Sequence, residues 1–356
     1  MATLAFKLSR KACIYHCCTY HIIRLFEFHG SLFFAFFLQT MYSWISWIIP
    51  VLFFWKIVIP FLLIVFRYTL GRKWYSKRNH LRKAGEWAIV TGATAGIGKA
   101  YAEELASDGL NVMIISRSQQ KLDEFAKELQ EKYNVQVKTV QADFTQVSEV
   151  DQLPSIACLV NNVGMVNVNP LSFPFADEMS LRDIERFVSC NCISMASMIH
   201  IVLPRLVEQN SGAAVINLSS FSGCNPLPYL TLYSGTKAFD RHLSNSLAVE
   251  LNDRNVIVQT VCPMYVATSM VGRRRGFFVL DPREYVRSAL NQLGVETLTY
   301  GHWIHALQIF YFSFLPQSLI ILSNLYLQNV FVLYEQTNCP VLLMSLQKGT
   351  FIDVLS

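Results

Sequence analysis

Residues 87–116 read WAIVTGATAGIGKAYAEELASDGLNVMIIS, and this stretch has the clearest pattern of secondary structure in the chain. The apolar run WAIV predicts a short buried strand, the residues from Lys99 predict a helix that ends at Gly109, and NVMIIS predicts a second buried strand. A strand, a glycine turn, a helix and a parallel strand form one βαβ unit. The stretch therefore predicts an α/β domain with a parallel sheet.

The turn TGATAGIG, residues 91–98, predicts a dinucleotide site. It places Gly92, Gly96 and Gly98 where the backbone must pass close to a pyrophosphate. The helix that follows directs its N-terminal amides at the anion. A tight turn without a ligand is the alternative, but the strand before the glycines and the helix after them favour binding.

The end of the second strand indicates which dinucleotide is bound. Ser116 and Arg117 stand 18 and 19 residues after Gly98, where a site for NAD would usually offer a carboxylate to the ribose hydroxyls. A guanidinium suits the 2′-phosphate of NADP, because it can donate two parallel hydrogen bonds. We therefore expect NADPH as the cofactor; the alternative is a surface arginine just past a strand.

Composition points to a membrane. Of the 356 residues, 52% are hydrophobic and 15% are charged, and the apolar excess lies in residues 31–66 and 297–334. The net charge of +5 is modest, so membrane contact explains the basic residues better than nucleic acid does. The nine cysteines have neither disulfide-like nor zinc-ligand spacing, which favours a reducing compartment and no metal.

The first apolar stretch is long enough for a permanent membrane anchor, since a span needs about 20 residues. With Pro50 near its middle, residues 31–66 form either one kinked span or a hairpin. Four Lys/Arg precede the stretch and seven follow it in residues 67–83, which places the C-terminal side in the cytosol. For the second apolar stretch, a lid or surface helices are preferred to another span.

An ordered set of motifs identifies a family. The motifs are TGATAGIG (91–98), ADF (142–144), NNVG (161–164), Asn191 in SCNCIS, NLSS (217–220), Tyr233 with Lys237, and PMYVAT (263–268). In this order and spacing they resemble the short-chain dehydrogenase/reductase family over about residues 85–335. The chain is most similar to its membrane-anchored branch of 17β-hydroxysteroid dehydrogenases and very-long-chain 3-oxoacyl-CoA reductases. The resemblance implies a single doubly wound, Rossmann-like parallel sheet.

The family's catalytic set falls on Asn191, Ser220, Tyr233 and Lys237. Tyr233 would give a proton to a carbonyl oxygen that Ser220 holds by a hydrogen bond. Ser220 has the family spacing, thirteen residues before Tyr233, although neighbouring Ser219 and Ser222 are alternatives. Lys237, one helical turn on, would favour the phenolate form of Tyr233. The resemblance adds that Lys237 holds the nicotinamide ribose and that Asn191 positions a relay water.

The cofactor contacts implied by the glycine turn, Arg117 and the resemblance together extend along the whole domain. By resemblance Asp143 lies near the adenine, Asn161 and Gly164 shape the loop beside its ribose, and Thr268 contacts the carboxamide side. The full set is Gly92, Ala95, Gly96, Ile97, Gly98, Ser116, Arg117, Asp143, Asn161, Gly164, Tyr233, Lys237, Pro263, Val266 and Thr268.

The expected organisation has six parts and a lipid substrate. The parts are an N-terminal segment (1–30), the anchor (31–66), a basic linker (67–84), the catalytic domain (85–295), apolar C-terminal helices (296–338) and a tail (339–356). Candidate substrates are a very-long-chain 3-oxoacyl-CoA in fatty acid elongation, which is preferred, or a 17-oxosteroid. Arg273, Arg274 and Arg275 could meet coenzyme A phosphates, lipid headgroups or water.

Location, partners and rival functions follow from the same reading. We expect the endoplasmic reticulum membrane with the catalytic domain in the cytosol, a possible homodimer and possible elongation partners, but no nucleic acid. A catalytically inactive lipid-associated protein is a rival, disfavoured because Ser220, Tyr233 and Lys237 are all present. A transporter is disfavoured by the intact nucleotide motifs and the scarcity of apolar spans.

Overall fold

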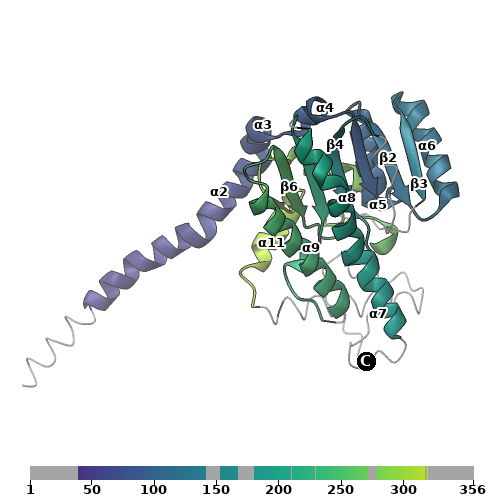
Figure 1. Cartoon of the computed structure of the whole chain (residues 1–356). Coiled ribbons are helices and arrows are strands. Elements are labelled where there is room, and N and C mark those ends of the chain that lie inside the picture. Colours follow the sequence, from purple (N-terminus) through teal and green to yellow (C-terminus); the bar gives the residue numbers. More distant parts are fainter. Residues whose placement is uncertain are drawn as a thin grey trace, which may run out of the picture. The chain divides into compact units, whose positions relative to one another are not determined.

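A parallel sheet of seven strands, in the order β3-β2-β1-β4-β5-β6-β7, organises the unit that begins at Ile64 (Figure 1). The computed structural model describes residues 39–141, 153–166, 180–209, 211–228, 230–271, 278–316 and 319. The strands are β1 (Trp87–Thr91), β2 (Asn111–Ser116), β3 (Val137–Gln141), β4 (Ile156–Asn161), β5 (Ala213–Leu218), β6 (Val256–Val261) and β7 (Leu298–Thr299). The predicted doubly wound parallel sheet is confirmed.

The strand order reverses beside β1, which creates the switch point of the sheet. β1 pairs with β2 on one side, with Val90 opposite Ile114, and with β4 on the other, with Val90 opposite Val160. Ligands of open α/β sheets bind at the carboxyl ends of the strands beside such a reversal. The glycine turn leaves β1 at this point.

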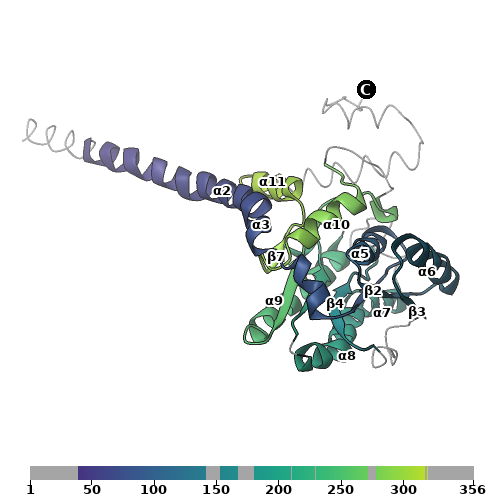
Figure 2. The ribbon, with the colours of Figure 1, turned by 90° about the horizontal axis from the view of Figure 1, so that it is seen from above.

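Side chains of the strands point alternately to the two faces of the sheet, and each face has its own hydrophobic core. On β1, Ala88 and Val90 pack on one face, whereas Trp87 and Ile89 pack on the other, as the two-residue period of a strand requires. The three layers are seen from above in Figure 2. One face carries α5 (Gly96–Ser107), α6 (Gln119–Tyr133) and α10 (Pro282–Asn291); the other carries α8 (Ser194–Glu208) and α9 (Thr231–Glu250).

Asn191 lies in a widened turn of a long helix, and its side chain is buried in the domain. α7 (Leu181–Val188) begins with a capping box of Ser180 and Asp183, passes through the π-turn η6 (Ser189–Ile193), and continues as α8. Such wide turns within helices are frequent at functional sites. Shorter elements complete the domain: the 3₁₀ turns η7 (Phe221–Gly223) and η8 (Ser269–Val271), and α11 (Trp303–Phe312).

The described part of the expected anchor is helical and apolar. Residues 39–53 are α-helical through Pro50, followed by the π-turn η1 (Phe54–Val58) and α2 (Ile59–Phe66). No return at Pro50 is present, so the described residues adopt the continuous form rather than the hairpin. By length and composition, the helical run Gln39–Ala84 could cross a membrane. The run Leu181–Glu208 passes the same test but belongs to the packed domain.

Residues 67–84, expected as a basic linker, form helical turns that belong to the catalytic unit. They are η2 (Arg67–Gly71), α3 (Arg72–Tyr75), η3 (Arg78–His80) and α4 (Leu81–Ala84). Leu81 is part of the core, and Arg78 pairs with Glu104 at 2.8 Å and with Asp108 at 2.7 Å. At the other end, β7 extends the sheet beyond the expected boundary at residue 295.

Candidate active site

The glycine turn forms a close-fitting cradle at the switch point. Gly92 and Gly96 have φ values of +63° and +56°, in the left-handed region that favours glycine. A Cβ at Gly98 would collide with the carbonyl oxygen of Gly92 and with the side chain of Asn162. Ala95, the extended N-cap of α5, provides no side-chain cap, so the first amides of the helix stay available for an anion. Ile97 packs against the core.

The loop after β6 closes one side of this cradle. A Cβ on Gly96 would lie 2.9 Å from Cγ2 of Thr268. Val266 forms a bridge with Leu280, and the carbonyl oxygen of Pro263 accepts a hydrogen bond from the amide of Phe221 at 2.9 Å. Thus the predicted Pro263–Thr268 segment contacts both the glycine turn and the serine loop.

The adenosine side of the predicted site is only partly described. Ser116 Oγ lies 2.8 Å from Thr94 Oγ1 of the glycine turn. The Arg117 side chain is exposed and forms no ion pair with another described residue. Its guanidinium is therefore open to a phosphate. Asp143 and the arginines 273–275 lie outside the described residues.

Buried side-chain hydrogen bonds link β4, β5 and α9. Asn161 Nδ2 donates to Asn217 Oδ1 at 2.8 Å, and Asn217 Nδ2 donates to Ser244 Oγ at 2.8 Å. Ser244 Oγ in turn donates to the carbonyl oxygen of Asp240 at 2.6 Å. Asn161, expected to shape the ribose loop, thus uses its amide nitrogen within the sheet.

Asn162, which the sequence reasoning missed, forms hydrogen bonds with the glycine turn. Its Nδ2 donates to the carbonyl oxygens of Thr91 and Gly92 at 3.2 and 3.3 Å, and its backbone amide donates to Thr91 Oγ1 at 3.0 Å. The signal in the sequence was the pair Asn161–Asn162, but the pair alone does not indicate which side chain contacts the glycine turn.

The serine alternatives separate clearly. Ser219 Oγ is buried and donates to the carbonyl oxygen of Lys237 at 2.6 Å, so it fixes α9. Ser222 is also buried, at 4% exposure. Ser220 is half-buried and its Oγ accepts from the amide of Ser222 at 3.2 Å, which leaves the hydroxyl proton free to donate. The geometry therefore favours the predicted Ser220.

Asn191 and Lys237 converge on the loop after β4. Asn191 Oδ1 accepts from the amide of Met165 at 2.8 Å, and a Cβ on the neighbouring Gly164 would lie 3.3 Å from Lys237 Nζ. Lys237 is buried, and its Nζ donates to the carbonyl oxygen of Leu218 at 2.8 Å. The lysine ammonium thus lies where the ends of β4 and β5 meet.

Lys237 also has a partner that the sequence reasoning did not single out. Its Nζ donates to Oδ2 of Asp240 at 2.9 Å within a pair whose side chains are 5% and 0% exposed. Burial opposes the charge of Lys237, but the Asp240 carboxylate and the nearby Tyr233 phenol raise its pKa above the ordinary value. Tyr233 itself is half-buried on the first turn of α9.

An apolar wall stands beside the serine loop. Phe221, which follows Ser220, packs in a cluster with Leu227, and α11 contributes Ile309 and Phe312 to it. The ring centroids of Phe221 and Phe312 are 6.0 Å apart. The beginning of the C-terminal apolar segment therefore packs against the loop that follows Ser220.

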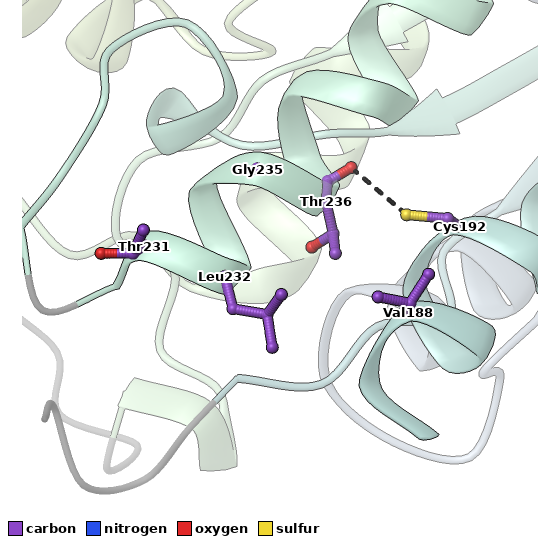
Figure 3. Close-up of a pocket in the computed structure, with 6 residues that line it drawn as sticks. All are labelled: Val188, Cys192, Thr231, Leu232, Gly235 and Thr236. Carbon is purple, nitrogen blue, oxygen red and sulfur yellow. Dashed lines mark hydrogen bonds between the residues drawn. The ribbon is translucent and has the colours of Figure 1, made fainter. Parts of the chain in front are cut away.

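A separate shallow groove of about 300 Å³ lies between η6 and the start of α9 (Figure 3). It contains none of the four predicted catalytic side chains. Cys192 and Thr236 face each other across it, with Cys192 Sγ 4.0 Å from the carbonyl oxygen of Thr236. Its lining residues are Val188, Cys192, Thr231, Leu232, Gly235 and Thr236.

Known proteins share this architecture. The profile of the family described as "short chain dehydrogenase" matches residues 86–276. Among curated relatives, the very-long-chain 3-oxoacyl-CoA reductase of Bos taurus is 43% identical over 63% of this chain and 73% of its own length. The human "inactive hydroxysteroid dehydrogenase-like protein 1" is 38% identical over 68% of this chain and 76% of its own length.

Solved structures agree. A short-chain dehydrogenase from Sphingobium yanoikuyae in complex with NADPH has a TM-score of 0.51 and 30% identity, covering 57% of this chain and 82% of that one. A 7β-hydroxysteroid dehydrogenase has a TM-score of 0.59 and 25% identity, covering 67% and 96%. The predicted family and reaction class are confirmed: the chain belongs to the short-chain dehydrogenase family and is an oxidoreductase acting on CH–OH and C=O groups.

Proposed function

We propose that this protein reduces the ketone of a very-long-chain 3-oxoacyl-CoA to a 3-hydroxyacyl-CoA with NADPH, as a step of fatty acid elongation. One observation carries the proposal. The loop of Ser220 and Phe221 packs against apolar residues of α11 at the carboxyl end of β5, where Lys237 Nζ bonds to Leu218. Relatives named very-long-chain 3-oxoacyl-CoA reductase support the same substrate class.

The residues present fit a nicotinamide dinucleotide. The cradle around Gly98 has no room for a Cβ, and the uncapped start of α5 offers amides to a pyrophosphate. Arg117 would bind the 2′-phosphate of NADPH, since its exposed guanidinium is unpaired among the described residues. When bound, the cofactor supplies the hydride.

The chain itself supplies the proton and holds the oxygen. Ser220 donates a hydrogen bond to the substrate carbonyl, and Tyr233 gives its phenolic proton to that oxygen as negative charge develops there. The Lys237 ammonium favours the resulting phenolate. Asn191 keeps the loop after β4 in place, and its Oδ1 retains a second lone pair for the relay water.

An apolar substrate also fits the described part of the N-terminal apolar stretch. The helical run from Gln39 carries exposed Trp44, Trp47 and Phe53, which suit a membrane, so a substrate that partitions into lipid would reach the site. We place the protein in the endoplasmic reticulum membrane with the catalytic unit in the cytosol. A homodimer and partner enzymes of elongation belong to the same proposal.

A 17-oxosteroid is the second candidate substrate. The wall of Phe221, Leu227 and Phe312 would accept a flat hydrocarbon as well as an acyl chain. Likeness to a structure described as a 7β-hydroxysteroid dehydrogenase favours keeping this candidate.

Turnover in membranes tests the proposal. Microsomes containing the full-length chain are supplied with NADPH and either a long 3-oxoacyl-CoA, androstenedione or estrone, with the Tyr233→Phe variant as the matched control. We expect NADPH consumption with the acyl-CoA and a loss of at least about a hundredfold in the variant, the usual scale of a lost general acid. Reduction of the steroids alone would replace the acyl-CoA by the second candidate. Equal rates in variant and wild type would refute the catalytic assignment.

A further inference from the structure

A carboxylate is buried beside the catalytic lysine. Asp240 lies three residues after Lys237 on α9, so both side chains project from the same face of the helix. Its side chain is completely buried, and Oδ2 accepts from Lys237 Nζ at 2.9 Å. The other oxygen, Oδ1, is buried without a hydrogen-bond partner among the described residues. Such a costly arrangement requires an explanation, because a buried carboxylate is stable only when it is paired.

The position of Asp240 matters because Tyr233 and Asp240 flank the same ammonium. Tyr233 precedes Lys237 by four residues on α9, so the two side chains project from the same face of the helix, one turn apart. An isolated ammonium would attract a phenolate strongly inside the protein, where charges are poorly screened. A carboxylate at 2.9 Å turns that ammonium into one end of an ion pair, whose field at the phenol is much weaker.

The other titratable groups near the pair do not replace this effect. From η6, Cys190 and Cys192 face the lysine, and burial raises the pKa of both thiols, so they are neutral near pH 7. Cys224 and Cys262, which follow η7 and β6, are paired with each other at 3.7 Å between their sulfur atoms. The two thiols of η6 therefore add no charge beside the Lys237–Asp240 pair near neutral pH.

We propose that Asp240 is a built-in counter-ion of Lys237, which keeps the proton on Tyr233 through neutral pH and so extends the range in which the site can reduce a ketone. Asp240 acts through Lys237 and is a positioning residue, not a group that touches substrate. The inference rests on the proposed role of Tyr233 as proton donor. It concerns the pH range of that role and not the identity of the ketone.

The Asp240→Asn variant removes the charge and keeps the shape. The ionisation of Tyr233 is followed by the absorbance of tyrosinate as the pH is raised. For wild type and for Asp240→Asn, the curve of the same protein with Tyr233→Phe is subtracted, which leaves the contribution of Tyr233 alone. This measurement needs no turnover, so it remains decisive even if neither candidate substrate is reduced. We expect the Tyr233 step to move to lower pH by about one to three units in Asp240→Asn, the usual effect of exposing an ionisable group to an unpaired opposite charge. Glu250→Gln removes an exposed carboxylate from the same helix and should leave the step unchanged.

Turnover gives a second readout. In Asp240→Asn, the alkaline loss of ketone reduction and the alkaline rise of alcohol oxidation should both move to lower pH by the same amount. Because an unpaired buried ammonium can destabilise the fold, Asp240→Leu serves as a second variant that fills the space without a polar atom. An unchanged or raised Tyr233 step in a folded variant would overturn the proposal. So would a wild-type protein without activity that gains it on substitution of Asp240, since the carboxylate would then be a block on Lys237.

Discussion

The side chain of Asn191 is bonded to the backbone of Met165 at both ends, with Oδ1 accepting from the amide at 2.8 Å and Nδ2 donating to the carbonyl oxygen at 3.0 Å. Nδ2 also lies 3.0 Å from Thr236 Oγ1 on α9. One amide therefore holds the loop that carries Gly164 against the helix that carries Lys237.

Replacing Asn191 by leucine should release this loop. We expect Asn191→Leu to lower the free energy of unfolding by about 1–3 kcal/mol, because the backbone of Met165 and the buried Thr236 hydroxyl lose their partner, and to raise the KM for NADPH. Urea unfolding and initial rates measure the two effects. Asn252→Leu, at an exposed position after α9, is the matched control; equal losses in both variants would contradict the prediction.

Arg117→Ala should weaken NADPH far more than NADH. A hydrogen bond to a charged group contributes about 1.5–3 kcal/mol, so the KM for NADPH should rise roughly tenfold to a hundredfold while that for NADH changes little. Lys121→Ala removes an exposed cation from the nearby helix α6 and should alter neither value tenfold. Equal effects of Arg117→Ala on both cofactors would remove the case for phosphate recognition.

Two glycine-to-alanine substitutions should act in opposite directions. At Gly98 a Cβ would meet the carbonyl oxygen of Gly92, so Gly98→Ala should cost about 1–3 kcal/mol of stability and abolish tight NADPH binding. At Gly235, inside α9, a Cβ would meet nothing within 4 Å. There alanine should add about 0.5–1 kcal/mol, because it restricts the unfolded chain. Thermal unfolding with and without NADPH tests both, and a neutral Gly98→Ala would show that the cradle is looser than described.

His305 makes the fold sensitive to acid. It is fully buried, and burial lowers its pKa to about 4 from 6.5. The amide of Met264 donates to Nδ1 at 3.3 Å, and Nε2 lies 3.3 Å from the carbonyl oxygen of Tyr265, an arrangement that suits the neutral ring. Because the folded pKa is the lower one, the stability contribution is complete above pH 6.5 and is lost as the pH falls to about 4.

The size of that loss is measurable. A difference of 2.5 pH units, from 6.5 to 4, corresponds to about 3 kcal/mol at most. Urea unfolding between pH 7 and pH 4 should therefore show a flatter dependence in His305→Gln than in wild type. His200→Gln, at an exposed position on α8, should keep the wild-type slope. Parallel curves for wild type and His305→Gln would disprove the assignment.

Cys224 should be a reactive thiol near neutral pH. Its Sγ lies 3.7 Å from Sγ of Cys262. The hydrogen bond between the two sulfur atoms, outweighing burial and aided by Arg241, lowers the pKa of Cys224 to about 7. Burial raises the pKa of Cys158 to about 12. Alkylation by iodoacetamide, followed on the Cys224 peptide by mass spectrometry, should therefore be half-maximal in rate near pH 7. A midpoint near 9, the ordinary value, would be the contrary outcome.

Local patterns were sufficient to predict the central features. The run from Trp87 to Ser116 has the strand, turn and helix signals of a βαβ unit within thirty residues, so its fold is encoded locally. The spacing of Tyr233 and Lys237 predicts that they lie one turn apart on a helix, and both lie on α9; their catalytic roles stay a prediction.

Burial and side-chain direction could not be predicted in the same way. An Asp three residues after a Lys on a helix looks like an exposed ion pair, and only the packing of α9 against the sheet and the neighbouring helical turns buries Asp240. Likewise Asn161 and Asn162 are adjacent in sequence, yet one amide faces β5 and the other faces the glycine turn. The pleat at the end of β4 determines that Asn161 points to β5 and that Asn162 points to the glycine turn.

A chain of hydrogen bonds runs from Asn161 through Asn217 and Ser244 to the backbone of Asp240, and it fixes the positions of β4, β5 and α9 relative to one another. Sliding α9 by a single residue along the sheet would break these hydrogen bonds, so they fix the spacing between the loop after β4 and Tyr233 on α9. Because these bonds lie within β4, β5 and α9, the surface loops could change in sequence while the distance between the loop after β4 and Tyr233 stays the same.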